Sequence, residues 1–195
     1  LELAKRGIDV YGIDSSPEML SIAQQKTAEE GYQILFLRQK MQEIDLYGTV
    51  DTVFCTLDSI NHLTNETDVQ KTFQRISLFL NPGGYFLFDM NTVYKHREIL
   101  ANHTFVYDTE KVYCVWQNRY EPKTDKVRVS LDFFERDRNV YHRSSESFTE
   151  RAYELPVVLE WLEKAGLEPG PVYGEMTFAS PTDDSERVVI AAKKP

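Results

Sequence analysis

The sequence lacks an apolar run that approaches the roughly 18 residues of a membrane-spanning helix. It also lacks a basic start followed by an apolar stretch, which is the pattern of a secretory signal peptide. Hydrophobic residues make up 42% and charged residues 27% of the 195 positions, which is typical of a globular protein. We therefore expect a cytoplasmic protein with no membrane partner.

Cysteine and positive charge are also scarce. Cys55 and Cys114 are the two cysteines, and both fall in apolar stretches without C-x-x-C spacing, which favours buried free thiols over a disulfide and suggests no metal site. The net charge is -9, and residues 93–152 in the middle of the chain are close to neutral. Nucleic-acid binding depends on clustered Lys and Arg, so we expect no nucleic-acid partner.

Residues 1–92 alternate short apolar stretches with amphipathic ones. We predict strands at 8–13, 34–37, 50–56 and 85–88. One helix begins after Ser16, with Pro17 at its first position, and another begins after Asn65. This alternation is typical of a parallel sheet with helices on its faces, the α/β class.

The pattern changes after Asn91. Val127, Val129 and Leu131 alternate with polar residues, which predicts an antiparallel meander of three or four strands over about 104–152. A helical period returns at 155–162, and strands follow near 172–178 and 187–192. We therefore predict one α/β domain, residues 1–92 and 153–195, that is interrupted by a β insertion, residues 93–152.

Asp14 closes the first predicted strand. A carboxylate at this end of a strand in a doubly wound fold can accept hydrogen bonds from both hydroxyls of a nucleotide ribose. An acidic residue near a helix N-terminus is also favoured by the helix dipole alone. The residue by itself does not separate these two interpretations.

Four stretches in the same order resemble class I S-adenosylmethionine (SAM)-dependent methyltransferases. Residues 12–20 (GIDSSPEML) resemble the second-strand motif, 51–55 (DTVFC) the fourth strand, 80–86 (LNPGGYF) the turn into the fifth strand, and 186–194 (ERVVIAAKK) the last strand. The resemblance implies a Rossmann-like sheet, mostly parallel with an antiparallel last strand, that carries an antiparallel β cap. The family's first strand and glycine-rich turn are absent from this chain, and we expect them to precede Leu1.

The resemblance also implies where SAM binds. Asp14 would hold the ribose, Ser15 and Met19 would lie by the adenosine, and Met41 would contact the adenine. Lys40 stands where the family commonly has Asp, so Gln39 or Gln42 is a candidate substitute, and a plain polar turn at 38–43 is the alternative. The implied cofactor-binding set is Asp14, Ser15, Met19, Lys40, Met41, Cys55 and Leu57, and the product is S-adenosylhomocysteine (SAH).

In small-molecule members of the family, the loop after the fourth strand faces the acceptor. Here Asp58 and Asn61 are candidates to position an amine or hydroxyl, and His62 is a candidate proton acceptor. Helix capping and loop hydrogen bonds are the alternative, which we favour for His62. Three further histidines of the insertion are candidate bases for an oxygen nucleophile: His96, His103 and His142.

The insertion stands where many small-molecule methyltransferases have a β cap, and by position and strand count it resembles that of glycine and sugar N-methyltransferases. Candidate substrate residues are Asn91, Tyr94, Tyr113, Trp116 and Arg119. A simple cap core is the commoner role for aromatic residues on strands, and an exposed cap strand is a candidate homodimer interface.

The sequence thus predicts methyl transfer from SAM to a nitrogen or oxygen nucleophile of a small molecule by direct displacement. One alternative is a non-catalytic SAM-binding or dimerisation domain. A second is an NAD(P)-dependent oxidoreductase, which shares an acidic residue after its second strand. A nucleic-acid methyltransferase is disfavoured because the loop after the fourth strand lacks an N/D-P-P-Y/F motif.

Overall fold

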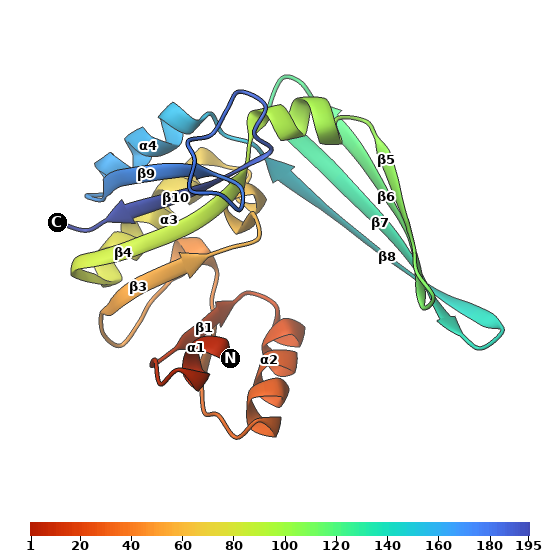
Figure 1. The fold of residues 1–195 in the computed structure, drawn as a ribbon, viewed down its shortest axis with the longest axis horizontal. Coiled ribbons are helices and arrows are strands. Elements are labelled where there is room, and N and C mark those ends of the chain that lie inside the picture. The colour runs from red at the N-terminus through yellow and green to blue at the C-terminus, as the bar shows by residue number, and fades with distance from the viewer.

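The computed structural model describes residues 1–195, which form three β-sheets (Figure 1). The first sheet pairs the parallel strands β1 (Tyr11–Asp14) and β2 (Leu35–Arg38). In the second sheet, β3 (Val50–Cys55) pairs in parallel with β4 (Leu80–Asn91). β1 pairs with no strand other than β2, and β3 pairs with no strand other than β4. The gap between β1 and β3 is where the resemblance places the family's first strand.

The second sheet is completed by the end of the chain. β10 (Arg187–Lys193) runs antiparallel to β4, and β9 (Glu168–Gly174) lies outside it in the order β3-β4-β10-β9. β9 is antiparallel to β10 and therefore points the same way as β4. The predicted sheet, with one antiparallel strand at the end of the sequence, is confirmed.

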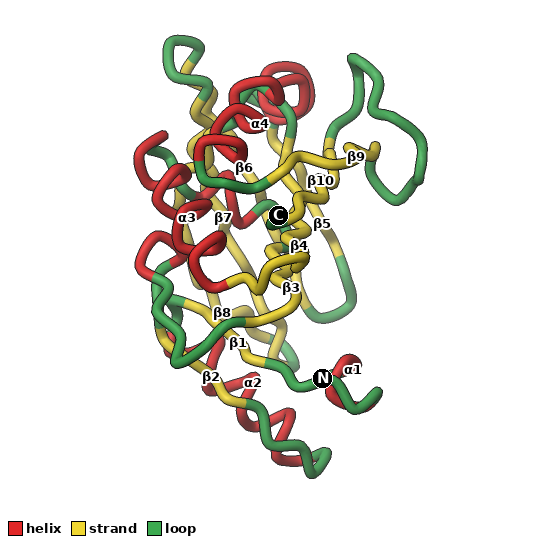
Figure 2. The backbone as a smooth tube through the Cα atoms, turned by 90° about the vertical axis from the view of Figure 1, so that its left-hand side faces the viewer, coloured by secondary structure: helices red, strands yellow, loops and turns green.

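Four α-helices accompany these strands: α1 (Glu2–Lys5), α2 (Pro17–Glu29), α3 (Glu66–Phe79) and α4 (Leu155–Lys164). Helix α2 begins as predicted, because the hydroxyl of Ser16 accepts a hydrogen bond from the Met19 N–H at 3.1 Å. Helices α3 and α4 cover one side of the second sheet (Figure 2). None of the helices has both the length and the apolar character needed to cross a bilayer.

The main core lies between this sheet and its two helices. Phe73 of α3 is fully buried, and its ring centroid lies 5.9 Å from that of Phe86 and 5.6 Å from that of Phe88, both on β4. The short 3₁₀ helix η1 (Met41–Glu43) leads the chain from β2 to this core, where Ile44 is buried. The Arg75 side chain donates to the Ile44 carbonyl at 2.5 Å and so connects α3 to the segment that follows β2.

The turn predicted between α3 and the next strand is present at the start of β4. Gly83 has a φ of 80°, a conformation that favours glycine. A Cβ on Gly84 would lie 2.8 Å from the carbonyl oxygens of Asn81 and Asp51. The Pro-Gly-Gly sequence therefore allows close backbone approach. β4 is longer than the predicted 85–88 because it continues to pair with β10 up to Asn91.

The insertion forms the third sheet, an antiparallel meander of β5 (Thr104–Asp108), β6 (Val112–Glu121), β7 (Lys126–Asp137) and β8 (Val140–Arg151). The sheet projects from the rest of the molecule (Figure 1), and its own small core contains Leu100, Val127 and Val129. A π-helical turn, η3 (Lys95–Leu100), connects β4 to this cap. β5 and β8 are its free edges. A homodimer through one of them stays a prediction.

The prediction of a strand at 172–178 was wrong in its bounds. β9 ends at Gly174, where the chain turns and Met176 takes a φ of 53°. The strand begins earlier, at Glu168, and includes Pro169 and Pro171. Proline lacks an N–H donor but is tolerated on an edge strand, and β9 is such an edge.

Candidate active site

Asp14 is the last residue of β1, and its side chain is exposed at the carboxyl end of the sheet. One carboxylate oxygen, Oδ1, accepts from the Ser16 N–H at 2.8 Å, and Oδ2 accepts from no group of the protein. Ser15 and Met19 are also exposed next to it, and Met19 is 56% exposed at the start of α2. Asp14 therefore offers a free anionic oxygen to a hydroxyl donor.

Met41 and Cys55 approach each other from different elements, a short helix and a strand. Met41 opens η1 after β2, and its Sδ lies 3.7 Å from the Sγ of Cys55 at the end of β3. Lys40 is exposed at the N-cap of η1. The Gln39 amide exchanges two hydrogen bonds with the backbone of Asp45, at 2.8 and 2.9 Å. These bonds leave Gln42, not Gln39, as the candidate substitute for the missing acidic residue.

The loop after β3 has two consecutive residues in the left-handed region, Leu57 with φ 58° and Asp58 with φ 49°. This conformation costs a non-glycine residue about 1–2 kcal/mol, and such strain is concentrated at functional sites. The Asp58 N–H donates to Oδ2 of Asp89 at 3.3 Å. Asp89, near the end of β4, therefore helps to hold the strained loop.

Arg187, the first residue of β10, connects this loop to its surroundings. Its guanidinium donates to Asp89 Oδ2, and it lies 3.4 Å from Asp58 Oδ2 and 3.5 Å from Glu175 Oε1. Burial opposes the charge of Arg187, but the hydrogen bond with Asp89 and the charges of the three carboxylates raise its pKa above the ordinary value. Arg187 therefore remains a cation that neutralises part of an acidic cluster.

Asn61 and Asn91 attach the loop to β4 and to the cap. Asn61 is fully buried, and its Nδ2 donates to the carbonyl oxygens of Asn91, at 3.1 Å, and Arg151, at 3.0 Å. Its Oδ1 accepts from the Asn91 N–H at 2.9 Å. Both polar atoms of the Asn61 side-chain amide are thus hydrogen-bonded to backbone groups. The Asn91 side chain donates to Asp58 at 2.5 Å. Asn61 holds the loop in place, and Asp58 keeps one carboxylate oxygen, Oδ1, without a protein partner.

His62 lies beside Glu150, a residue that no motif in the sequence marks. Its Nε2 is 3.9 Å from Oε1 of Glu150, a buried residue near the end of β8. Of the three insertion histidines, His96 contacts the same carboxylate at 3.5 Å. His103 bonds the Ile99 carbonyl at 2.8 Å, and His142 lies 3.8 Å from Asp137.

The five candidate substrate residues do not share one surface. Trp116 pairs with Leu131, which pairs with Glu146, so Trp116 is on the same cap face as Glu150. Tyr113 and Arg119 are three positions from Trp116, and an odd offset on a strand places them on the opposite face. Tyr113 and Arg119 therefore do not lie on the cap face that carries Trp116 and Glu150.

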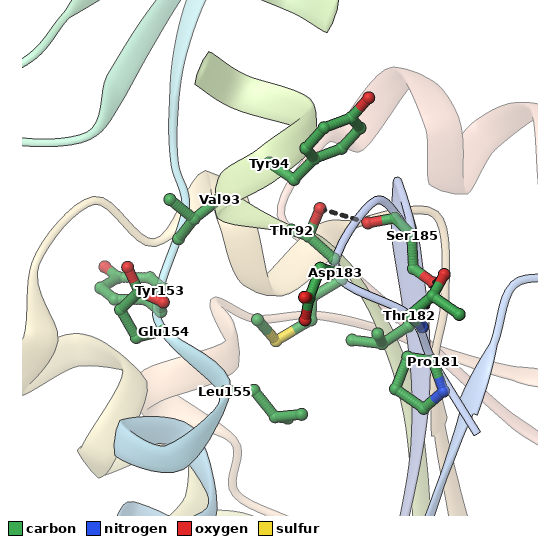
Figure 3. A pocket seen from close by; sticks show the side chains of 12 residues that line it. Thr92, Val93, Tyr94, Tyr153, Glu154, Leu155, Pro181, Thr182, Asp183 and Ser185 are labelled. Carbon is green, nitrogen blue, oxygen red and sulfur yellow. Dashed lines mark hydrogen bonds between the residues drawn. The ribbon is translucent and has the colours of Figure 1, made fainter. Parts of the chain in front are cut away.

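Tyr94 lines a separate cavity of about 300 Å³ between η3, α4 and the loop before β10 (Figure 3). Met90 and Val188 also line this cavity. On β4, Met90 alternates with Asp89 and Asn91, so the cavity and the acidic cluster occupy opposite faces of the sheet. Tyr94 and Asn91 therefore do not meet in one site.

Both cysteines are free thiols, as predicted, and the environment of Cys55 makes it unreactive. Burial, assisted by the charge of Asp89, raises the pKa of Cys55 to about 12. The thiolate is the nucleophile, and at neutral pH the thiolate fraction of Cys55 is about a thousandfold smaller than that of a thiol with a pKa near 9.

We expect Cys55 in native protein to react with a disulfide reagent at least about a hundred times more slowly than in urea-unfolded protein. The rate in a Cys114→Ser variant measures this, and equal rates in the two states would contradict it.

The strand order, the antiparallel β10 and a carboxylate at the end of β1 define a Rossmann-like methyltransferase fold. Residues 1–84 match the family model described as a methyltransferase domain. A methyltransferase-family protein of Geobacillus sp. (strain WCH70) is 34% identical over 197 residues, which cover 100% of this chain and 79% of the relative.

Two solved structures extend the comparison. A SAM-dependent methyltransferase from Clostridium acetobutylicum ATCC 824 superposes with a TM-score of 0.91 at 30% identity, over 96% of this chain and 75% of the other. CalS10, an amino pentose methyltransferase from Micromonospora echinaspora solved with SAM bound, gives a TM-score of 0.74 at 18% identity, over 95% and 74%. The chain belongs to the class I SAM-dependent methyltransferase family, and its cofactor is SAM.

Proposed function

We propose that the protein transfers a methyl group from SAM to a nitrogen or oxygen atom of a small molecule. The observation that carries this proposal is the strained Leu57–Asp58 loop. It leads from Cys55, which contacts Met41, to a polar cluster beneath the cap that contains Asp58, Asn91 and Glu150. A cofactor held at the ends of β1–β3 would thus be next to groups able to position an acceptor.

In this proposal, residues 1–92 and 153–195 bind SAM and residues 93–152 form a lid. Asp14 accepts from the ribose hydroxyls, Ser15 and Met19 flank the adenosine, and Met41 and Cys55 form the apolar wall at the adenine. Lys40 lies at the rim, and Leu57, which is 77% exposed, faces the bound nucleoside.

The cofactor supplies an activated methyl group. The free Oδ1 of Asp58 accepts a hydrogen bond from the amine or hydroxyl of the acceptor, and Asn61 keeps the loop in position. Holding the reacting atoms in line contributes on the order of 7 kcal/mol or more in favourable cases. His62, in the same loop as Asp58 and beside Glu150, is the candidate base. Trp116 is the candidate aromatic residue for substrate contact, because it lies on the cap face that carries Glu150.

Ligand binding tests the cofactor assignment directly. We expect the full-length protein to show a rise in melting temperature with SAH and none with NAD or NADP, because binding to the folded state stabilises it. A shift with NAD or NADP alone would favour an oxidoreductase, and no shift with any of the three would favour a non-catalytic domain. Transfer of tritium from methyl-labelled SAM to a panel of amines, amino sugars and alcohols then tests catalysis. SAH binding without transfer to any acceptor would leave a SAM-binding domain.

A further inference from the structure

A buried carboxylate near the end of the last cap strand lies between two histidines. Glu150 is 5% exposed, and each of its oxygens faces an imidazole. Oε1 is 3.9 Å from Nε2 of His62, in the loop after β3, and Oε2 is 3.5 Å from Nε2 of His96, in η3. Asn91 also donates to Oε2 at 3.4 Å. One side chain thus connects the cap, η3, β4 and the loop after β3.

The neighbours of His96 determine which form of its ring is satisfied. The ring is fully buried, and both of its nitrogens face acceptors: the Asp125 carbonyl is 3.4 Å from Nδ1, and Glu150 is next to Nε2. A neutral imidazole has one donor and one acceptor, whereas the imidazolium has two donors. A neutral ring therefore satisfies only one of these two acceptors, and Nε2, which faces Glu150 at 3.5 Å, has no hydrogen-bond partner.

Glu150 is held in its ionised form. Burial alone would raise the pKa of this carboxyl, but its contact with His96 and the charges of His62 and His96 outweigh burial and lower the pKa below its usual value. The amide of Asn91 adds to the effect. Glu150 therefore presents a permanent anionic oxygen, Oε1, to His62.

We propose that Glu150 is a positioning residue that orients His62 as the base of the methyl-transfer site. This inference rests on the proposed function. A carboxylate beside Nε2 fixes the proton of the neutral ring on that nitrogen, in the way that a buried acid orients histidine in other catalytic sites. Nδ1, which has no hydrogen-bond partner in the protein, is then free to accept a proton. At 3.9 Å the contact between Nε2 and Glu150 is longer than a hydrogen bond, but catalytic hydrogen bonds are often long in ligand-free enzymes and shorten in the complex.

A base at this position implies that the acceptor atom is protonated when it binds. The acceptor group is therefore a hydroxyl or an ammonium group. The proton of the acceptor goes to Nδ1 of His62, before the attack for an ammonium group, whose lone pair is thereby freed, and during the attack for a hydroxyl. The lone pair of the nucleophile forms the bond to the methyl carbon, the electrons of the carbon–sulfur bond go to sulfur, and SAH leaves. Because Glu150 belongs to the cap and His62 to the loop after β3, the base is oriented only when these two elements are in contact.

The main test removes the whole pair. A Glu150→Leu/His96→Leu variant removes the buried carboxylate together with the imidazole that faces it, and such paired replacements by apolar residues are often neutral or even stabilising. We expect the neutral His62 ring to have its proton on Nε2 in the wild type, and on either nitrogen in the variant. Nitrogen-15 spectra of histidine-labelled protein above neutral pH distinguish the two forms, and a His62→Gln variant assigns the signal.

Kinetics with the acceptor found in the panel provide the second measurement. We expect kcat to fall at least about tenfold in the double variant, which is less than the roughly 10²–10⁴-fold of a complete general base because His62 itself remains, with SAH binding changed less than about twofold. The Glu150→Gln variant keeps an acceptor oxygen, so its kcat should fall less than that of the double variant. The matched control is Glu146→Leu, an exposed glutamate on the same strand and the same cap face.

Two results would overturn the inference. One is a His62 proton that stays on Nε2 in the double variant, whatever happens to kcat. The other is a kcat equal to that of the Glu146→Leu control. Absence of SAH binding or of methyl transfer in the wild type would instead refute the proposed function itself, so the two failures are distinguishable.

Discussion

The Asp14→Asn variant is expected to bind SAM at least about tenfold more weakly than the wild type. A hydrogen bond to a charged group contributes about 1.5–3 kcal/mol, and a tenfold change in Kd corresponds to about 1.4 kcal/mol. Asparagine keeps one oxygen for the Ser16 N–H, so the start of α2 should be preserved. The second oxygen becomes an NH₂ group, which cannot accept from a ribose hydroxyl. Isothermal titration calorimetry with SAM measures the change.

Asp14→Ala should weaken binding at least as much, because it removes both oxygens. The matched control is Asp9→Ala, an exposed aspartate before β1 that makes no side-chain hydrogen bond or ion pair. Its Kd should stay within about twofold of the wild type, since a distant surface charge contributes little. Near-normal affinity in both Asp14 variants would remove Asp14 from the cofactor site, and the proposed position of SAM would fall with it.

Asp14 could be chosen from the sequence because the features that place it are local. The apolar stretch before it, the N-cap at Ser16 and Pro17 at the first helical position all lie within a few residues. The same is true of α3, whose buried Val69, Phe73 and Ile76 follow the helical period, and of the alternating strands of the cap. Elements with strong local periodicity were therefore predicted correctly, and boundary errors arose where pairing with distant strands sets the strand ends, as in β4 and β9.

The acidic cluster could not be predicted in the same way, because pairing across the chain creates it. Arg187 and Asp58 are far apart in sequence, and their contact depends on the antiparallel register in which Arg187 lies opposite Asn91. Glu150 is one of several polar residues on β8, and only the burial of its strand end distinguishes it from Glu146. The left-handed backbone of Leu57 and Asp58 has no glycine to signal it.

One signal in the sequence, the period of the strand, separates the candidate substrate residues of the cap. Tyr113, Trp116 and Arg119 lie on a predicted strand, where alternate residues face opposite sides. Counting positions in twos groups Trp116 with Cys114 and Asn118. The same count on β8 groups Glu150 with Phe148, whose ring centroid lies 5.1 Å from that of His62. The period of the strand thus identifies the cap face that meets the site.

Replacing Arg187 by methionine is expected to lower the free energy of unfolding by about 3–5 kcal/mol, the usual cost of removing one partner of a buried ion pair. Arg187 is 16% exposed at its side chain, and Asp89 beneath it is 11% exposed. Oδ1 of Asp89 already has no hydrogen-bond partner, so loss of the guanidinium would leave the carboxylate with the Asp58 N–H alone. The Leu57–Asp58 loop would lose part of the support for its strained backbone. Urea unfolding monitored by circular dichroism measures the loss.

Two comparisons show whether the loss arises from an unpaired buried charge. Arg143→Met removes an ion pair of 2.8 Å with Asp132 on the cap, where Arg143 is 62% exposed, and should cost no more than about 1 kcal/mol. Arg187→Met/Asp89→Asn removes the anion together with the cation, and should recover stability relative to Arg187→Met because neighbouring residues are energetically coupled. If Arg187→Met costs no more than Arg143→Met, or if the second substitution recovers nothing, Asp89 is solvated in the native protein. In that case Arg187 does not hold the loop on which the proposed acceptor site depends.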